Sequence, residues 1–411
     1  MSLGAYVKAL RRQKHWTQSE LAKDITTKSM VSQLELGKAR PSMRVIIQLL
    51  ARLEADMVTA VEQDATTIDE WKQWATALLE EHQHDEAMRV IERLLQKDIT
   101  HEERIEWLLK FSLAALRQRK GDLVIRVLSP LEGELEEKRF SDPILTLYHY
   151  LGYAYIYQGD TMMSYHYFDR CEQGLQTVGN HSDPLIQLRT CINLGYVLMQ
   201  LQRYEEAKQR FLRADLAWNQ QIPIKWKGFL YHHLAICARR LGEQEEAKKY
   251  LDEASRWYLL DPEENRDAII ILNGERAKLM ADNGKYEEAI AFFTHSFSQR
   301  DLLADTNMKI DVSAKMAEFY YKAGRLEEAL GLLNGILGEK HRPSPSLAYA
   351  FHVRGQIYRA LDRNKESVED ISCAADIYQK VKYHKDMAQA LEDLDEVLHD
   401  LFDEELVSCM R

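Results

Sequence analysis

Four polar residues within one short segment could form hydrogen bonds with the edges of DNA bases: Lys28, Ser29, Ser32 and Gln33. A Gln side chain presents a donor and an acceptor that match adenine, and a Lys ammonium can donate to guanine. In a helical segment, Val31 and Leu34 lie on the opposite face and would be buried. The spacing therefore predicts a short helix with one face against a core and the other free to enter a major groove.

A second group of residues is suited to the phosphate backbone of DNA. Gln18 is expected to offer its backbone N–H at the start of the preceding helix, and three basic residues follow the polar segment: Lys38, Arg40 and Arg44. Residues 1–53 contain ten Lys/Arg and three Asp/Glu, a formal charge of +7, whereas the rest contains 44 and 62, a formal charge of -18. Contact with nucleic acid is therefore expected only at the N-terminal end.

Helix-capping signals predict the elements that hold these residues. Thr17 and Glu20 have the spacing of a capping box, so a helix should begin at Gln18. Thr27 is a second N-cap candidate, and Gly37 suits the left-handed residue that follows a helix. The predicted helices cover residues 3–13, 18–25, 28–36 and 43–54. Short helices in this order, with a tight turn between the second and the third, form a helix-turn-helix.

The motifs TQSELA, SQLELG and KARPS, spread over Leu10 to Ser42, resemble the helix-turn-helix of the Xre/Cro/phage-repressor family. The turn reads Ile25-Thr26-Thr27 and lacks the Gly that is usual in that family. The resemblance implies that Arg11 and Glu35 form an internal ion pair, so these two residues are assigned to structure and not to base recognition.

Small residues recur at a fixed spacing from residue 63 onward. They come in pairs twelve positions apart, and successive pairs are 38 to 43 residues apart: Gly152 with Ser164, Gly195 with Ala207, Ala235 with Ala247, Ala277 with Ala289, Ala317 with Ala329, and Gly355 with Ser367. Small residues at both places let two antiparallel helices approach closely, and a repeat of this length indicates a solenoid. The pattern resembles the tetratricopeptide repeat, lengthened by about six residues. Degenerate pairs near His84 and Gly121 bring the predicted number to eight.

The predicted fold is all-α. A helix-turn-helix domain covers residues 1–62, a right-handed α-solenoid of about eight lengthened tetratricopeptide helix pairs covers 63–384, and a C-terminal capping helix covers 385–411. No segment approaches the roughly 18 uninterrupted apolar residues of a membrane helix, so no membrane partner and a cytoplasmic location are expected.

Catalytic and cofactor motifs are missing from the sequence. It contains no phosphate-binding Gly-rich loop, no nucleophile elbow and no H-E-x-x-H helix, so neither an enzyme nor a cofactor is expected. The five cysteines are far apart and form no C-x-x-C pair, so neither a disulfide framework nor a metal site is expected.

An Xre-type head joined to lengthened tetratricopeptide repeats is similar to the RRNPP family, the peptide-pheromone receptors of Gram-positive bacteria. The resemblance implies a transcriptional regulator that binds operator DNA as a homodimer or higher homo-oligomer. It also implies that a short signalling peptide binds the concave face of the solenoid and changes how the heads meet DNA.

The repeat register predicts which residues face that peptide. The inner helix of each pair lines the groove, and the residue two positions before its small residue should project into it. Asn193 occupies this place, and its amide can bind the main chain of an extended peptide whatever the peptide sequence. Family members are expected to use an Asn at the matching position. The predicted peptide-binding residues are Tyr150, Tyr153, Arg189, Asn193, Tyr196, Gln200, His233, Arg240 and Lys315.

A second function remains open from the sequence. The repeats could serve as an interaction scaffold that binds and inhibits another protein, such as a response regulator, with the head only locating or autoinhibiting it. Binding to DNA upstream of the gene would separate the two functions.

Overall fold

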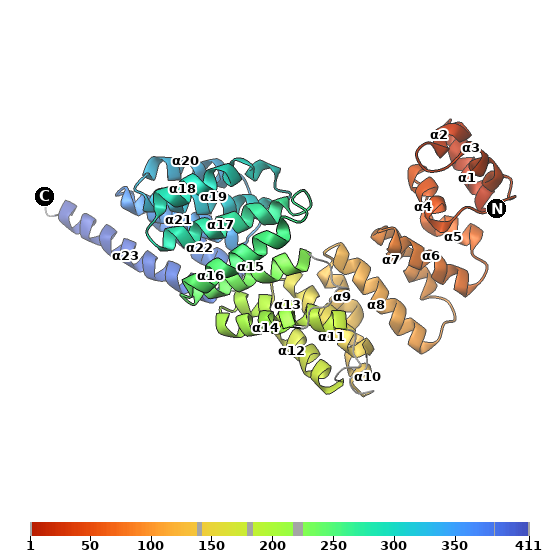
Figure 1. Cartoon of the computed structure of the whole chain (residues 1–411), viewed down its shortest axis with the longest axis horizontal. Helices are drawn as coiled ribbons and strands as arrows, with labels where there is room; N and C mark the ends of the chain where they lie inside the picture. The colour runs from red at the N-terminus through yellow and green to blue at the C-terminus, as the bar shows by residue number, and fades with distance from the viewer. Residues whose placement is uncertain (1, 138–141, 179–183, 217–224, 382, 410–411) are drawn as a thin grey trace. The chain divides into compact units, whose positions relative to one another are not determined.

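The computed structural model describes residues 2–137, 142–178, 184–216, 225–381 and 383–409, and within these ranges the regular elements are all helices. Figure 1 shows their succession from α1 to α23. Contacts divide the chain into two compact units, Met1–Gln158 with Gln173–His181, and Gly159–Glu172 with Ser182–Arg411. The predicted all-α fold, a helix-turn-helix followed by helical repeats, is confirmed. The predicted domain boundaries remain predictions.

The head consists of five helices: α1 (Leu3–Gln13), α2 (Gln18–Ala22), α3 (Lys28–Glu35), α4 (Met43–Arg52) and α5 (Met57–Asp64). The capping box of Thr17 and Glu20 is present, Thr27 caps α3, and Gly37 has a φ of 66°. The prediction that the second helix reaches Ile25 is wrong. It ends at Ala22 because Asp24 adopts a left-handed conformation with a φ of 61°, which turns the chain toward α3 without a Gly.

Helices α1 and α3 are in backbone contact inside the head. A Cβ atom on Gly4 would lie 2.0 Å from the carbonyl oxygen of Leu34. Only a residue without a side chain fits at this position. This contact fixes how deeply α3 sits in the head and leaves its outer face exposed.

Eight consecutive helix pairs follow the head in the described chain, as predicted. They are α6 (Ile68–Glu80) and α7 (His84–Leu94), α8 (His101–Arg117) and α9 (Gly121–Leu128), α11 (Asp142–Tyr157) and α12 (Thr161–Val178), α13 (Pro184–Gln200) and α14 (Tyr204–Leu216), α15 (Lys225–Arg240) and α16 (Gln244–Tyr258), α17 (Arg266–Asp282) and α18 (Tyr286–Ser298), α19 (Thr306–Lys322) and α20 (Leu326–Leu337), and α21 (Pro345–Ala360) and α22 (Asn364–Lys380). A short α10 (Glu132–Glu137) follows α9, and α23 (His384–Cys409) ends the chain.

A left-handed residue marks the turn within every pair. Among the described residues these are His82, Arg119, Gly159, Gln202, Gly242, Gly284, Gly324 and Asp362. The second small residue of each pair follows five positions later. The same offset assigns Ala87 and Val124 to the two degenerate pairs, and Ala75 and Ser112 stand twelve positions before them. All four are fully buried, so the register holds where the motif is weak.

The small residues bring the two helices of a pair into contact. A Cβ atom on Gly195 would lie 2.8 Å from the ring of Phe211, and one on Gly355 would lie 2.5 Å from Cγ1 of Ile371. The hydroxyl of Ser367 also donates a 2.8 Å hydrogen bond to the carbonyl of Gly355. Close packing at these positions sets the distance between inner and outer helices, and therefore the depth of each groove segment.

The C-terminal helix α23 packs against α22 and closes the last core cluster. Ala390 and Val397 are fully buried in that cluster, with Met387 and Leu394 packed beside them. Helix α23 therefore lies where the sequence predicts a capping helix, and in the described chain it runs from His384 to Cys409.

Two glycines test the role of close packing. Gly355→Ala should lower stability by about 1–3 kcal/mol because the new methyl group overlaps Ile371. Gly331→Ala, in the interior of α20 where nothing lies within 4 Å, should instead raise stability by about 0.5–1 kcal/mol through helix propensity. Urea denaturation of both variants would check this, and a stabilised Gly355→Ala would contradict the packing argument.

Candidate functional site

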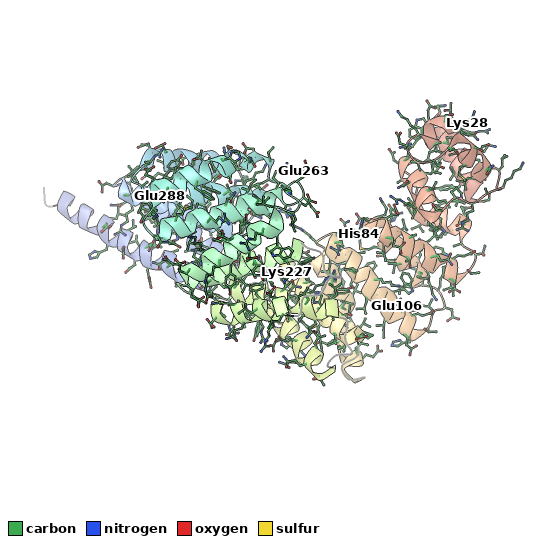
Figure 2. All side chains as sticks on the ribbon, in the orientation of Figure 1. Lys28, His84, Glu106, Lys227, Glu263 and Glu288 are labelled. Carbon is green, nitrogen blue, oxygen red and sulfur yellow. The ribbon has the colours of Figure 1, made fainter. Side chains whose placement is uncertain are left out.

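The third helix of the head presents the polar face expected from the sequence. Val31 and Leu34 are buried, at 0% and 4% exposure, while Lys28, Ser29 and Gln33 are exposed and Ser32 is half-buried. Figure 2 labels Lys28 at the start of this helix. Donors and acceptors on this face are therefore available to a ligand with the edge chemistry of bases.

A buried ion pair joins α1 to the end of α3. Arg11 donates to both carboxylate oxygens of Glu35, at 2.6 and 3.0 Å, and the Glu35 side chain is 1% exposed. Burial alone would raise the pKa of Glu35, but hydrogen bonds from Arg11 and Gln18 outweigh it, and the pKa is lowered. The ion pair that the family resemblance implies is confirmed by these contacts. The Gln18 amide donates to Glu35 at 2.9 Å, so this side chain also helps to hold the ion pair, while its backbone N–H remains the predicted phosphate contact.

The basic residues after α3 differ in their surroundings. Lys38 is exposed and forms no ion pair within the described chain. Arg40 lies 2.5 Å from the carboxylate of Asp64, and Arg44 lies 3.4 Å from Glu81. For Arg40 or Arg44 to contact a phosphate, the phosphate must replace a carboxylate.

Asp64 is the centre of the joint between the head and the first helix pair. It ends α5, accepts a 2.8 Å hydrogen bond from the indole of Trp74 on α6, and binds Arg40. At the other end of α5, Asp56 caps the helix and forms an ion pair with Arg89 on α7. Two polar clamps therefore hold the head to the first pair. Sequence reasoning missed them because their partners lie on separate helices.

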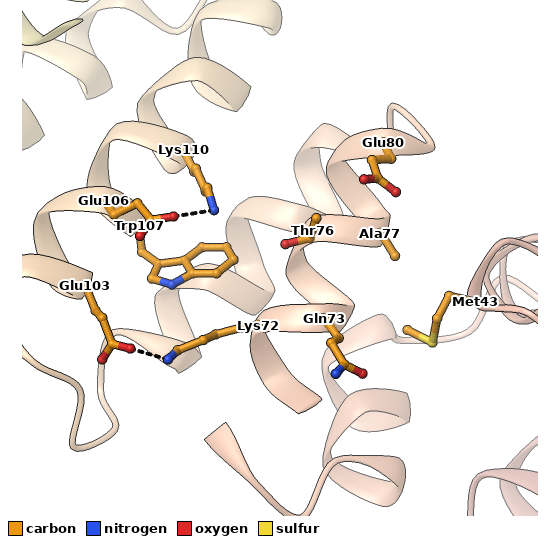
Figure 3. Close-up of a pocket in the computed structure, with 10 residues that line it drawn as sticks. All are labelled: Met43, Lys72, Gln73, Thr76, Ala77, Glu80, Glu103, Glu106, Trp107 and Lys110. Carbon is orange, nitrogen blue, oxygen red and sulfur yellow. Dashed lines mark hydrogen bonds and ion pairs between the residues drawn. The ribbon is translucent and has the colours of Figure 1, made fainter. Parts of the chain in front are cut away.

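A cavity of about 500 Å³ opens beside this joint (Figure 3). Met43 of α4 borders it, and the remaining walls come from α6 and α8. Gln73 and Lys110, each two positions before a buried small residue, both line it. Lys110 lies 4.3 Å above the Trp107 ring and 2.6 Å from Glu106. The position two before the small residue therefore faces the groove in the first two pairs as well. Lys110 was not predicted, because the motif around it is degenerate.

In the second unit, the inner helices α15, α17 and α19 meet through a buried ion network. Lys315, predicted to face a peptide, lies 2.8 Å from Glu275 and 2.7 Å from Asp311. Burial alone would raise the pKa of Glu275, but Lys315 and Arg239 together hold it well below its ordinary range. Lys315 is thus committed to the fold, and a ligand at this point would meet a charge-balanced surface.

Asn193 is 7% exposed on α13, and its side chain forms no hydrogen bond with the described part of the chain. An amide in this state has both donor and acceptor capacity to spare.

One residue predicted to bind the peptide together with Asn193 already has contacts within the fold. The ring of His233 lies 4.0 Å from that of Phe229 and 5.8 Å from that of Tyr196, and burial lowers the pKa of His233 to about 4. His233 therefore belongs to an aromatic cluster as a neutral ring.

The other predicted peptide-binding residues are placed as follows. Gln200 accepts a long 3.5 Å hydrogen bond from Thr161, Arg189 is half-buried, and Arg240 is exposed with its guanidinium 5.9 Å from the Tyr204 ring centre. Tyr150 and Tyr153 belong to α11 in the first unit, where both rings contact His149. Of the predicted residues, Tyr196 and His233 therefore lie in ring contact with each other. Lys315 forms an ion pair with Glu275.

Comparison with known proteins gives two family matches. Residues 7–58 match the helix-turn-helix family, and residues 188–215 and 230–258 match the tetratricopeptide repeat. The chain joins a helix-turn-helix head to tetratricopeptide repeats. Within the described residues, no helix combines the length and apolar character needed to cross a bilayer.

Two solved structures share the fold. NprR in complex with its cognate peptide NprX is 17% identical, with a TM-score of 0.52 over 70% of this chain and 82% of that one. The apo form of RapI is 14% identical, with a TM-score of 0.54 over 68% of this chain and 98% of that one. A curated protein, the 43 kDa receptor-associated protein of the synapse from Tetronarce californica, is 24% identical over 179 residues, 39% of this chain. The match spans less than half of that relative, 42% of its length.

The buried ion pair of the head gives a test with a defined pH dependence. Glu35→Gln should destabilise the head by about 3 kcal/mol at pH 7, because Arg11 keeps its charge and loses its partner. The folded-state pKa of Glu35 is below its unfolded value, so its contribution is complete above about pH 5 and is lost as pH falls through the folded pKa. The melting temperatures of Glu35→Gln and wild type should therefore converge as pH falls through the folded-state pKa of Glu35. Glu54→Gln, on an 82% exposed carboxylate, is the matched control and should change little. Equal melting of Glu35→Gln and wild type at pH 7 would refute the structural role.

Proposed function

We propose that this protein is a transcriptional regulator that binds operator DNA through α3 and is switched by a short signalling peptide in the groove of its repeats. The observation that carries the proposal is the exposed face of Lys28, Ser29 and Gln33 on the third helix of a matched helix-turn-helix domain. A formal charge of +7 over residues 1–53, against -18 for the rest, supports the head as the DNA-binding part.

The DNA-binding form is proposed to be a homodimer. A single helix-turn-helix buries little surface on DNA, and such domains reach useful affinity by placing two recognition helices in successive major grooves. The dimer contacts would come from the repeats, because the exposed face of α3 must remain free.

The peptide part of the proposal is supported by the fold shared with NprR, whose structure contains its cognate peptide. Here the uncommitted amide of Asn193 would bind the peptide main chain. The peptide acts on DNA binding only if it prefers one arrangement of the repeats, and a tenfold change in operator affinity requires about 1.4 kcal/mol of preference.

Two substitutions on the head separate base contact from phosphate contact. Gln33→Ala should weaken binding to selected sites by about 1–3 kcal/mol and relax the sequence preference, while Lys38→Ala should weaken all sites alike and reduce the salt slope by about one. The measurement is fluorescence anisotropy on duplexes selected from a random pool by the wild-type protein, with salt titration. Gln13→Ala, exposed on α1, is the control. Equal losses on selected and random DNA for Gln33→Ala would exclude the proposed base contact.

A substitution in the groove tests the peptide contact. Asn193→Ala should abolish retention of peptides whatever their sequence, because the amide would bind the main chain, and should leave the melting temperature unchanged. The probe is a random pool of synthetic octapeptides, with bound species separated by size exclusion and identified by mass spectrometry. Asn307→Ala, exposed on α19, should retain peptides like wild type. Undiminished retention by Asn193→Ala would remove this residue from the proposed site.

A further inference from the structure

A separate cavity of about 190 Å³ lies within the second unit, where α15, α17, α19, α21 and α22 meet Tyr383 and the first turn of α23. Its size suits one side chain or one chain end and not a whole peptide. Three of its basic residues are already paired. Arg239 lies 3.3 Å from Glu275 and 3.1 Å from Asp282, Lys278 lies 3.2 Å from Glu318, and Lys315 bridges Glu275 and Asp311.

Arg240 differs from these three. It is exposed, lines the cavity, and forms no ion pair with the described residues. Beside it, the Nε–H of Arg239 is buried and has no acceptor in the described chain. The cavity thus contains two neighbouring guanidinium groups with donors to spare. The hydroxyl of Tyr349 supplies no further donor, because it already donates to Glu318.

One residue of the remaining wall is itself acidic. Asp386 also lines the cavity, and its carboxylate accepts a 2.8 Å hydrogen bond from Gln202. Tyr378 and Tyr383 also line the cavity. A carboxylate accepts up to four hydrogen bonds and matches guanidinium donors in pairs, so it satisfies the unused N–H groups that a neutral or cationic group would leave unpaired.

We propose that this cavity is a carboxylate subsite, in which Arg240 and the Nε–H of Arg239 bind an acidic side chain or the C-terminal carboxylate of the ligand. The inference rests on the proposed function, because it names the part of the peptide that this section of the groove selects. Asp386 opposes the ligand charge and sets a limit on affinity, and the ligand must enter from the side where Arg240 is exposed.

The test uses the full chain and three synthetic octapeptide pools. The first is C-amidated and contains Asp and Glu, the second has a free C-terminus but no Asp or Glu, and the third is C-amidated without Asp or Glu. We expect at least tenfold greater retention of the first or the second pool than of the third. Greater retention of the first identifies an acidic side chain, and greater retention of the second identifies the C-terminus.

Variants assign the effect to the cavity. Arg240→Gln should reduce retention of the preferred pool to the level of the third pool with an unchanged melting temperature, and Arg240→Lys should restore part of it. Arg256→Gln, on an exposed arginine of α16 that pairs with Glu253, is the matched control and should behave like wild type. Asp386→Asn keeps an acceptor for Gln202, removes one negative charge, and should increase retention of the preferred pool.

The possible failures are distinguishable. Equal retention of all three pools by wild type, or equal retention of the preferred pool by wild type and Arg240→Gln, overturns the carboxylate subsite while peptide binding stands. No retention of any pool by wild type overturns peptide binding itself, and the subsite with it.

Discussion

Close approach of two helices at a pair of small side chains is the constraint on which the repeats depend. In each described pair, a left-handed residue turns the chain, and a fully buried small residue, or Val124 in the second pair, follows five positions later. Bulky side chains at these places would separate the helices and open the core, since interiors tolerate little extra volume. Every groove-facing side chain takes its position from this contact. The chemistry of the groove can therefore vary while its geometry is held by residues that never touch a ligand.

The repeat architecture was predictable because its determinants are local. Two small residues twelve apart, and the capping signals of Thr17 and Thr27, act within one or two helical turns and are visible in one sequence. The second pair was harder to recognise, since Val124 fills a place that Ala or Ser fills elsewhere. The sequence also did not mark the turns at Arg119 and Gln202, because these non-glycine residues adopt the left-handed conformation there.

The ion-pair partners of charged side chains were harder to predict than the positions of those side chains along the helices. The sequence placed Lys315 and Glu275 on groove-facing positions of successive repeats, and the structure shows that they neutralise each other. In the same way, Arg40 and Arg44 follow the recognition helix as expected, but each forms an ion pair with an acidic residue, Asp64 at the end of α5 and Glu81 directly after α6. Such pairings depend on how separate helices approach, and charge alone does not identify the partner. Arg11 with Glu35 was the exception, because the resemblance to a known head supplied the pairing.

The clamp at Asp64 gives the DNA an influence on the rest of the molecule. If phosphates draw Arg40 away from Asp64, this carboxylate keeps only the indole of Trp74, and the head is held less tightly to the first helix pair. By thermodynamic linkage the effect is reciprocal. If a groove ligand changes the affinity for the operator by some factor, the bound operator changes the affinity for that ligand by the same factor. In the proposed function, the operator is thus an effector in its own right. The ligand concentration needed for a response would differ from one promoter to the next.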